Sequence, residues 1–281
     1  TIKAEVGGVI AGTGARLNDY HDAAVDAKID SSAAIYARLI NVNANNRVVL
    51  TDKSNGTTGG VASVASSDGY SDLVLNTNVT IGNSAHLEVV GSASDDLTFN
   101  IAALNVINAD VKIVFISGGA LVGADHSNLT IYVKTDNANV TIGSDAVLIA
   151  AGAMTISARG RGSIVGQADI ETDGAASVSV GTTKVQVMPT NTITVNDRAH
   201  LTAMGDMSLV TGRDSNPDMA TSADYYVVTA RWDGFAGSAI PISDVDARAY
   251  IVQTNTVTLN SGSYLSGARQ INLYAERLGV V

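Results

Sequence analysis

Apolar and polar positions alternate in three-residue segments that recur along the chain. Each segment reads apolar, polar, apolar, and alternation with a period of two is typical of a β-strand that buries one face. The four clearest copies are Val79-Thr80-Ile81, Val140-Thr141-Ile142, Ile193-Thr194-Val195 and Val257-Thr258-Leu259. The pattern therefore predicts strands that repeat along the chain and lie above one another.

Two further slots recur after these segments. A leucine follows each copy at the same distance, and most leucines are followed by another alternating segment. The leucines are Leu87, Leu148, Leu201 and Leu265. The later segments are Met154-Thr155-Ile156, Met207-Ser208-Leu209 and Ile271-Asn272-Leu273, with Leu97-Thr98-Phe99 as the counterpart in the first of these units. A partial copy leads the chain, with Val25-Asp26-Ala27, Ile35 and Ile40-Asn41-Val42 in the three slots. The expected core of the repeat is Ile81, Leu87, Ile142, Leu148, Val195, Leu201, Leu259 and Leu265.

The repeats predict an all-β protein with one domain over residues 1–281. Successive units are about 57 residues long, with insertions that behave like loops on a regular scaffold. The units are approximately 1–57, 58–117, 118–165, 166–233 and 234–281. Between the segments lie turn residues, which favour sharp corners because Gly and Asn accept left-handed backbone angles. These corner segments are Gly82-Asn83-Ser84, Gly143-Ser144-Asp145, Asn196-Asp197-Arg198 and Asn260-Ser261-Gly262. Strands joined by corners predict an elongated parallel β-helix, or β-solenoid, of right-handed sense.

A unit of this length is long for one coil. With an assumed coil of about 23 residues, we expect two or three coils per unit, about 12 coils in all and a rod of roughly 60 Å. Helices are disfavoured because Asn, Thr, Ser and Gly are frequent.

No polar cap is evident at either end. The chain also starts Thr1-Ile2-Lys3, without an initiator Met or a signal peptide. We expect it to be a segment of a longer repetitive chain, or to stack end to end.

Glycine-rich segments recur as well. They are Gly7-Gly8-Val9-Ile10-Ala11-Gly12, Gly59-Gly60-Val61-Ala62, Gly118-Gly119-Ala120-Leu121-Val122-Gly123, Gly160-Arg161-Gly162-Ser163-Ile164-Val165-Gly166 and Gly234-Phe235-Ala236-Gly237. None is followed by a predicted helix or by the Lys-Ser/Thr of a phosphate loop, so we expect them to form bends rather than nucleotide sites.

Composition narrows the function. The 281 residues carry a formal net charge of -10, which argues against a nucleic-acid or anionic-membrane partner. There is no Cys, so disulfides and thiolate metal sites are excluded. No apolar run is long enough for a transmembrane helix, and we expect no membrane insertion.

The repeat Val-Thr-Ile-Gly-x-x-Ala-x-Leu, followed by a Met/Ile-Thr/Ser-Ile/Leu strand and a Gly-Gly segment, resembles the repeats of giant bacterial surface adhesins and filamentous-haemagglutinin-like β-solenoid proteins. The resemblance runs from about Val25 to Ala275. It implies an extracellular, bacterial cell-surface stalk or filament without enzymatic activity. It also implies a stiff rod for adhesion, biofilm or fibre assembly, which self-associates end to end or laterally. No catalytic residue and no cofactor follow from it.

The titratable residues give weak metal candidates. His86 and His200 occupy a slot that holds Val147 and Tyr264 in other units, which is unlike a fixed metal ligand. Acidic residues recur near the loops, at Asp95, Asp96, Asp214, Asp218, Asp244 and Asp246. An incidental calcium ion is one interpretation, but the established calcium-loop patterns are missing, and solvated surface charge is the simpler one.

One segment departs from the repeat. Between Gly212 and Ser243 lie four aromatic residues together with Arg213, Asp214, Asp224, Arg231 and Asp233. Aromatic faces beside carboxylates can hold a sugar ring, and paired carboxylates can cleave a glycosidic bond. The possible contacts to a surface glycan are Tyr225, Tyr226, Trp232 and Phe235. The alternative function is therefore a β-helical polysaccharide-binding or polysaccharide-degrading protein, like a tailspike or a lyase. The aromatic residues could equally cover an enlarged coil.

The middle residues of the repeated segments form a column of threonines that should face outward: Thr80, Thr141, Thr194 and Thr258. Ice-binding solenoids use flat outward arrays of Thr. Here the expected array is one residue wide, and intervening coils would make it sparse. A row of hydroxyls along a β-ladder is the more economical interpretation.

Overall fold

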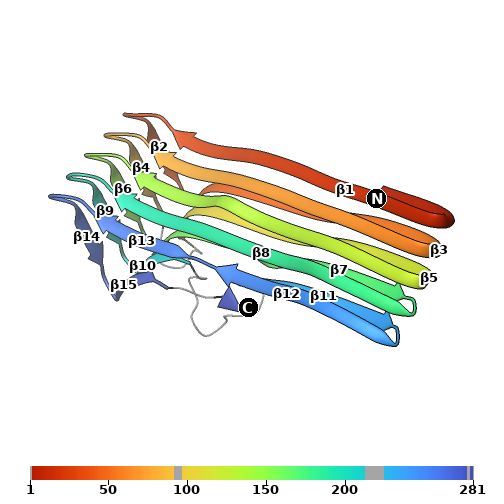
Figure 1. The fold of residues 1–281 in the computed structure, drawn as a ribbon. Helices are drawn as coiled ribbons and strands as arrows, with labels where there is room; N and C mark the ends of the chain where they lie inside the picture. The colour runs from red at the N-terminus through yellow and green to blue at the C-terminus, as the bar shows by residue number, and fades with distance from the viewer. Residues whose placement is uncertain (1, 92–96, 213–224, 277–278, 281) are drawn as a thin grey trace.

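The computed structural model describes residues 2–91, 97–212, 225–276 and 279–280, and these residues form strands and turns without a helix (Figure 1). In this part of the chain no helix is long and apolar enough to cross a membrane. The strands are β1 (Ile2–Ile29), β2 (Ala34–Ala37), β3 (Ile40–Ile81), β4 (His86–Val89), β5 (Thr98–Ile142), β6 (Val147–Ala150), β7 (Ala153–Asp173), β8 (Ala176–Val195), β9 (His200–Ala203), β10 (Met207–Thr211), β11 (Tyr226–Gly237), β12 (Ile240–Ile251), β13 (Thr254–Leu259), β14 (Tyr264–Gly267), β15 (Ile271–Ala275) and β16 (Gly279–Val280).

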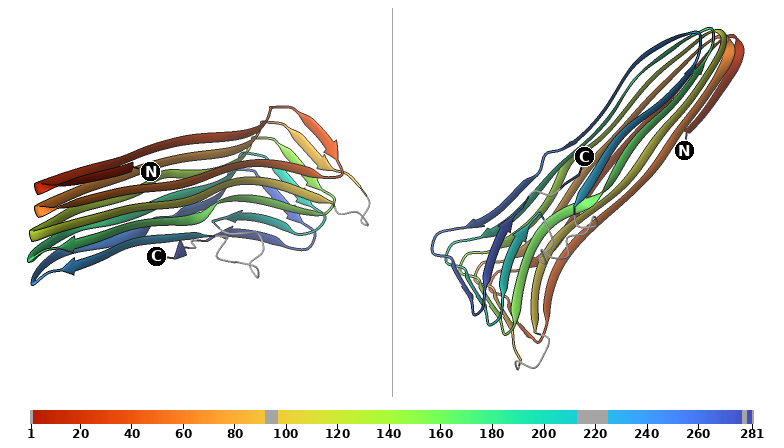
Figure 2. Two further views of the ribbon diagram at one scale, coloured as in Figure 1. Left: turned by 90° about the vertical axis from the view of Figure 1, so that its right-hand side faces the viewer. Right: turned by 90° about the horizontal axis from the view of Figure 1, so that it is seen from below.

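Each coil has two long sides and one short side. In the coil that contains β3, the chain runs out along residues 40–60, turns at Val61 and returns along residues 62–81. A corner then leads into the short strand β4. We call the outer surfaces of the two long sides the outgoing face and the returning face. The end with the tight turns is the narrow end, and the end with the short strands is the wide end (Figure 2). All pairings between neighbouring coils are parallel.

The structure has one coil per repeat, so the expectation of two or three short coils is wrong. The short strands form one sheet in the order β14-β9-β6-β4-β2, one strand for each of five coils. Equivalent residues in successive coils lie 52, 61, 53 and 64 residues apart. Each coil needs this many residues because each of its two long sides contains about 20. A side therefore spans roughly 65 Å along the strands, whereas the five stacked coils are only about 24 Å high. The molecule is long in the direction of its strands (Figure 2).

The predicted registers are largely confirmed. Thr80, Thr141, Thr194 and Thr258 pair in sequence, as do Leu87, Leu148, Leu201 and Leu265. Two placements were wrong by two residues each. Ala27-Lys28-Ile29, not Val25-Asp26-Ala27, pairs with residues 79–81. Phe99-Asn100-Ile101, not Leu97-Thr98-Phe99, pairs with residues 40–42. A two-residue slip preserves the alternation, which is why the sequence did not reveal it.

The predicted corners are confirmed, and each is a four-residue turn. Backbone hydrogen bonds close them, from the amide of Ala85 to the carbonyl of Gly82 and from Ala146 to Gly143, both at 3.3 Å. The third residue of every turn has a positive φ, as in a type II turn. These residues are Ser32, Ser84, Asp145, Arg198 and Gly262. Arg198 also binds Asp145 of the preceding coil through two hydrogen bonds of 2.7 and 2.8 Å, so the corners are tied across coils.

Glycine pairs form the tight turns of the narrow end. Gly7, Gly59 and Gly118 are paired in register, as are Gly8, Gly60 and Gly119. A Cβ on Gly60 would collide with the carbonyl oxygen of Gly8, and one on Gly119 with that of Val122. The other two predicted bends were placed wrongly. Residues 160–166 lie within β7, and the turn of that coil follows Asp173; in the last coil, only Gly237 of residues 234–237 pairs with a turn position.

Alternate residues point into the coil. The side chains of β8 alternate without exception between half-buried and buried. Two apolar clusters result, one at the wide end around Ile81, Ile142 and Leu148, and one in the middle around Leu73, Ile131 and Val185. The predicted core residues are buried in the inner coils. In the last coil, Leu265 is half-buried and Leu259 is 41% exposed, because no described coil covers them.

The interior of the narrow end is polar. Many of its buried side chains are small hydroxyl residues, among them Ser63, Ser117, Thr172 and Ser179, and two pairs bond across the interior. Asp125 lies among them, 3% exposed, and both carboxylate oxygens are without a hydrogen-bond partner within the described structure. Burial raises the pKa of Asp125 to about 7. Small side chains let the two long sides approach closely, at the cost of desolvated polar groups.

Neighbouring glycines of the third coil give a test of the tight turn. Gly119→Ala should lower the free energy of unfolding by about 1–3 kcal/mol, because the new Cβ meets the carbonyl oxygen of Val122. Gly118→Ala is the matched control, since a Cβ there meets no atom within 4 Å. Urea denaturation of both variants measures the difference. Equal stabilities would show that the turn tolerates a side chain.

The buried Asp125 predicts a stability that falls with pH. The folded pKa lies above the ordinary value of 3.8, so the folded state holds a proton that the unfolded state has lost between about pH 4 and pH 7. Stability should therefore decrease across this window and level off above it. Asp125→Asn should flatten much of the decrease and stabilise the protein at pH 8. Exposed Asp244→Asn is the control in urea titrations at several pH values; an unchanged pH profile of Asp125→Asn would contradict the assignment.

Candidate functional site

The outgoing face carries three columns of side chains in register. Successive members of each column come from neighbouring coils and point outward. The columns are Lys53, Lys112, Gln167 and Arg231; Asn55, Val114, Asp169 and Asp233; and Thr57, Ile116, Glu171 and Phe235. Cationic and amide side chains thus stand beside the two aspartates of the last two coils.

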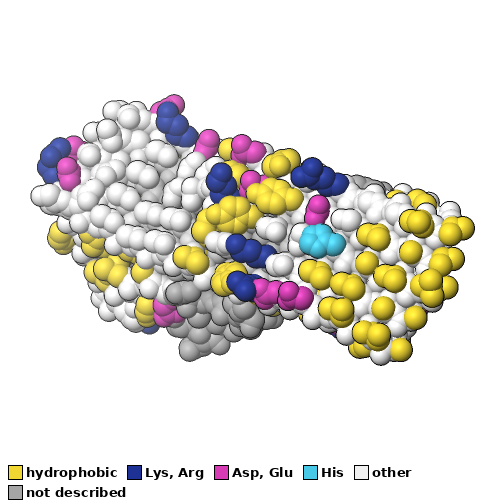
Figure 3. All heavy atoms as spheres, viewed as in Figure 1, with side chains coloured by type: hydrophobic (Ala, Val, Ile, Leu, Met, Phe, Trp, Pro, Cys, Tyr) yellow, Lys and Arg dark blue, Asp and Glu magenta, His cyan; other side chains and the backbone are white. Residues whose placement is uncertain are grey.

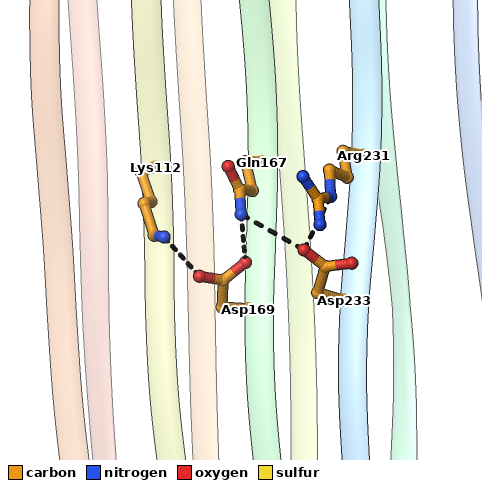
Figure 4. A network of polar contacts seen from close by, with 5 residues as sticks. All are labelled: Lys112, Gln167, Asp169, Arg231 and Asp233. Atoms are coloured by element: carbon orange, nitrogen blue, oxygen red, sulfur yellow. Dashed lines mark hydrogen bonds and ion pairs between the residues drawn. The ribbon is translucent and has the colours of Figure 1, made fainter.

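These columns are joined by a network of polar contacts (Figure 4). Lys112 forms an ion pair with Asp169, and the Nε of Arg231 lies 2.7 Å from the Oδ2 of Asp233. The amide of Gln167 donates to Asp169 at 2.6 Å and to Asp233 at 3.3 Å, so it bridges the two carboxylates. The network holds two acidic groups on adjacent strands in fixed positions, each balanced by a cation.

Beside the network is a shallow depression of about 400 Å³. Asp169, Glu171 and Asp233 line it together with Phe235, whose side chain is 61% exposed. Carboxylate oxygens accept hydrogen bonds from hydroxyl groups, and an exposed aromatic ring offers an apolar face. Two of the carboxylates are already engaged by cations of the same surface. This arrangement suits holding a hydroxylated ligand better than donating a proton to one.

The structure does not bring the four predicted glycan contacts together. Tyr225 is half-buried, and Trp232 points into the last coil, where its Nε1 is buried beside Gly181. Tyr226 is fully buried. Of the three that lie in β11, Phe235 points outward onto the outgoing face. The reason is alternation along β11: residues 226 and 232 share one side of the strand, and residue 235 the other.

Tyr226 instead belongs to a buried polar network between the two apolar clusters. Its hydroxyl donates to Asp136, and the amide of Asn105 donates to the other oxygen of Asp136 at 2.6 Å. Burial raises the pKa of Asp136 to about 6, against the opposing effect of these two hydrogen bonds. A register shift between Val133 and Asp136 turns this carboxyl inward. The network joins residues inside the fold, and no sequence pattern predicted it.

Two of the histidines stand in one column of the short-strand sheet. His86 and His200 share a column with Val147 and Tyr264, as predicted. His86 lies 3.1 Å from Glu88, and the ring of His200 packs against Tyr264. Within the described ranges no three His, Asp or Glu residues gather around a point that could hold a metal ion. Of the acidic pairs, Asp95, Asp96, Asp214 and Asp218 lie outside the described residues, and Asp246 pairs with Arg248.

The returning face has three zones (Figure 3). The narrow end exposes apolar residues such as Val122 and Ile242. The middle carries charged groups and four tyrosines, on the first, second, third and fifth coils, which sequence reasoning missed: Tyr20, Tyr70, Tyr132 and Tyr250. Their spacing becomes evident only once the register is known. At the wide end, the three outward positions before the corner hold only Asn and Thr in the last four described coils.

Comparison with models of known protein families, with curated proteins and with solved structures found no match.

Proposed function

We propose that the chain is a non-enzymatic structural segment of a secreted bacterial surface adhesin or extracellular filament. Parallel coils in register give a stiff body, because no coil buries its apolar residues alone and each is stabilised by its neighbours. One buried column supports this proposal, since it runs unbroken through the inner coils as Leu87, Leu148 and Leu201.

The observation that carries the proposal is the edge of the last coil. Leu259, Ile271 and Leu273 are 41–47% exposed there, although their register partners Val195, Met207 and Leu209 are fully buried. Among the described strands, β13 and β15 at this edge each pair with a neighbour on one side only. The first coil differs: Asp19 and His21 stand in register with Ser71 and Leu73, so its inward columns are partly polar. Stacking on further coils, through the apolar edge of the last one, would extend the body.

Association through this edge is testable on the purified chain. We expect concentration-dependent oligomers in sedimentation velocity and stacked particles in electron micrographs. Leu273→Lys should weaken association by placing a charge among the inward apolar residues. Ile10→Lys is the control, because Ile10 is exposed at the narrow end of the first coil. A chain that stays monomeric at high concentration, or equal association of both variants, would contradict the proposal.

The depression beside Phe235 favours a second candidate function, binding of a polysaccharide on the outgoing face. Phe235→Ala should lower affinity for a bound glycan several-fold, since the exposed ring supplies the apolar face of the depression. Tyr36→Ala is a matched control, because Tyr36 has the same 61% exposure at the wide end. Glycan-array binding followed by calorimetry measures the change. Depolymerisation of a polysaccharide that is lost in Asp169→Asn would instead establish an enzyme.

A further inference from the structure

The wide end of the returning face holds a regular, uncharged lattice of hydroxyl and amide groups, which we call the Thr/Asn array. It comprises three outward columns across four consecutive coils. Its members are Asn76, Asn78 and Thr80; Asn137, Asn139 and Thr141; Thr190, Thr192 and Thr194; and Thr254, Thr256 and Thr258. The expectation of a sparse column one residue wide is therefore wrong, because repeat units are single coils that stack directly.

The lattice has two fixed spacings. Neighbouring coils lie about 4.8 Å apart, and alternate residues along one strand lie about 6.6 Å apart. Both spacings are set by the backbone, since every member of the array pairs in register with a residue of a neighbouring coil. The threonine side chains add rigidity, because branching at Cβ restricts their χ1 rotation.

The amide groups are held as well. Asn137 donates to the Oδ1 of Asn76 at 2.9 Å, and Asn139 donates to that of Asn78 at 3.0 Å. Such ladders fix the orientation of each amide and leave its outer edge toward solvent. The surface therefore presents polar groups in fixed positions rather than on mobile side chains.

The array also lacks charge. Charged residues occupy its columns only in the first coil, at Asp26 and Lys28, and Figure 3 shows the uncoloured surface between the charged groups of the corner and those of the middle zone. A soluble charged partner would form no ion pair with the array. A regular surface that is electrically neutral and offers both donors and acceptors instead matches a solid that is itself a lattice of hydrogen-bonding oxygen atoms.

We propose that the Thr/Asn array binds ice. Threonine suits this surface because its hydroxyl hydrogen-bonds to water while its methyl group fills the space between ordered water molecules. The rigid parallel sheet presents these groups without a further loss of conformational entropy. This function goes beyond a structural role, and a filament segment that failed to bind ice would leave the structural proposal untouched.

The test is uptake of the purified chain into slowly growing ice, together with inhibition of ice recrystallisation. The unaltered chain should be enriched in the ice fraction. Thr192→Lys, at the centre of the array, should lose most of this uptake because a long charged side chain holds the surface away from the lattice. Thr256→Lys, on the exposed last coil, should show the same loss with less risk to folding.

Thr182→Lys is the matched control. Thr182 lies outward on the same strand, β8, and is half-buried like Thr192, but it stands outside the array. Circular dichroism melting curves show whether each variant is folded. Exclusion of the unaltered chain from ice would overturn the proposal, as would equal uptake of Thr182→Lys and the two array variants. Binding to microcrystalline cellulose without ice uptake would overturn it too, and would assign the array to a crystalline glycan.

Discussion

Parallel stacking in register is the constraint from which the rest of this structure follows. Each residue of one coil lies directly beside its counterpart in the next, so a side chain is selected for its fit with a near copy of itself. Apolar columns satisfy this readily, as Ile81, Ile142 and Val195 do in the core. Amides satisfy it by hydrogen-bonding along the stack. Opposite charges satisfy it by pairing directly, as where Arg198 binds Asp145, whereas like charges in one column are accompanied by a cation or an amide beside them.

The same constraint explains why the interior changes character along the coil. At the wide end the short strands hold the two long sides apart, and large apolar residues such as Leu148 and Met154 fill the space. Toward the narrow end the sides converge on a turn of two glycines, and serine and threonine replace leucine. The hydroxyl pairs Ser63–Ser117 and Thr172–Ser179 offset part of the cost of burial. Asp125 has no such partner in the described structure, so desolvation alone governs its pKa.

The sequence predicted the parts of the fold that repeat and missed those that depend on how far the chain runs between repeats. The alternating segments, the leucine column and the corners were found because each has a local signal. Coil length has none, since the outgoing and returning sides share one alternation and the glycine turn between them resembles any other bend. The prediction of the candidate site failed for the same reason, because it too depended on an unknown register. Whether Tyr226 and Trp232 face inward and Phe235 outward depends on register, which a slip of one residue reverses.

Register also decides what the surface can recognise. A residue on a loop is positioned independently of its neighbours, but one on this sheet takes its spacing from the backbone in both directions. Recognition therefore depends on columns rather than on single motifs. Thr192 is part of a binding surface together with Asn139 and Thr256, and Asp169 together with Asp233. Flexible ligands gain little from such regularity, whereas a rigid periodic ligand can match many positions at once without ordering either partner further. A solenoid whose sides are parallel sheets in register is thus better suited to extended, repeating surfaces than to small soluble molecules.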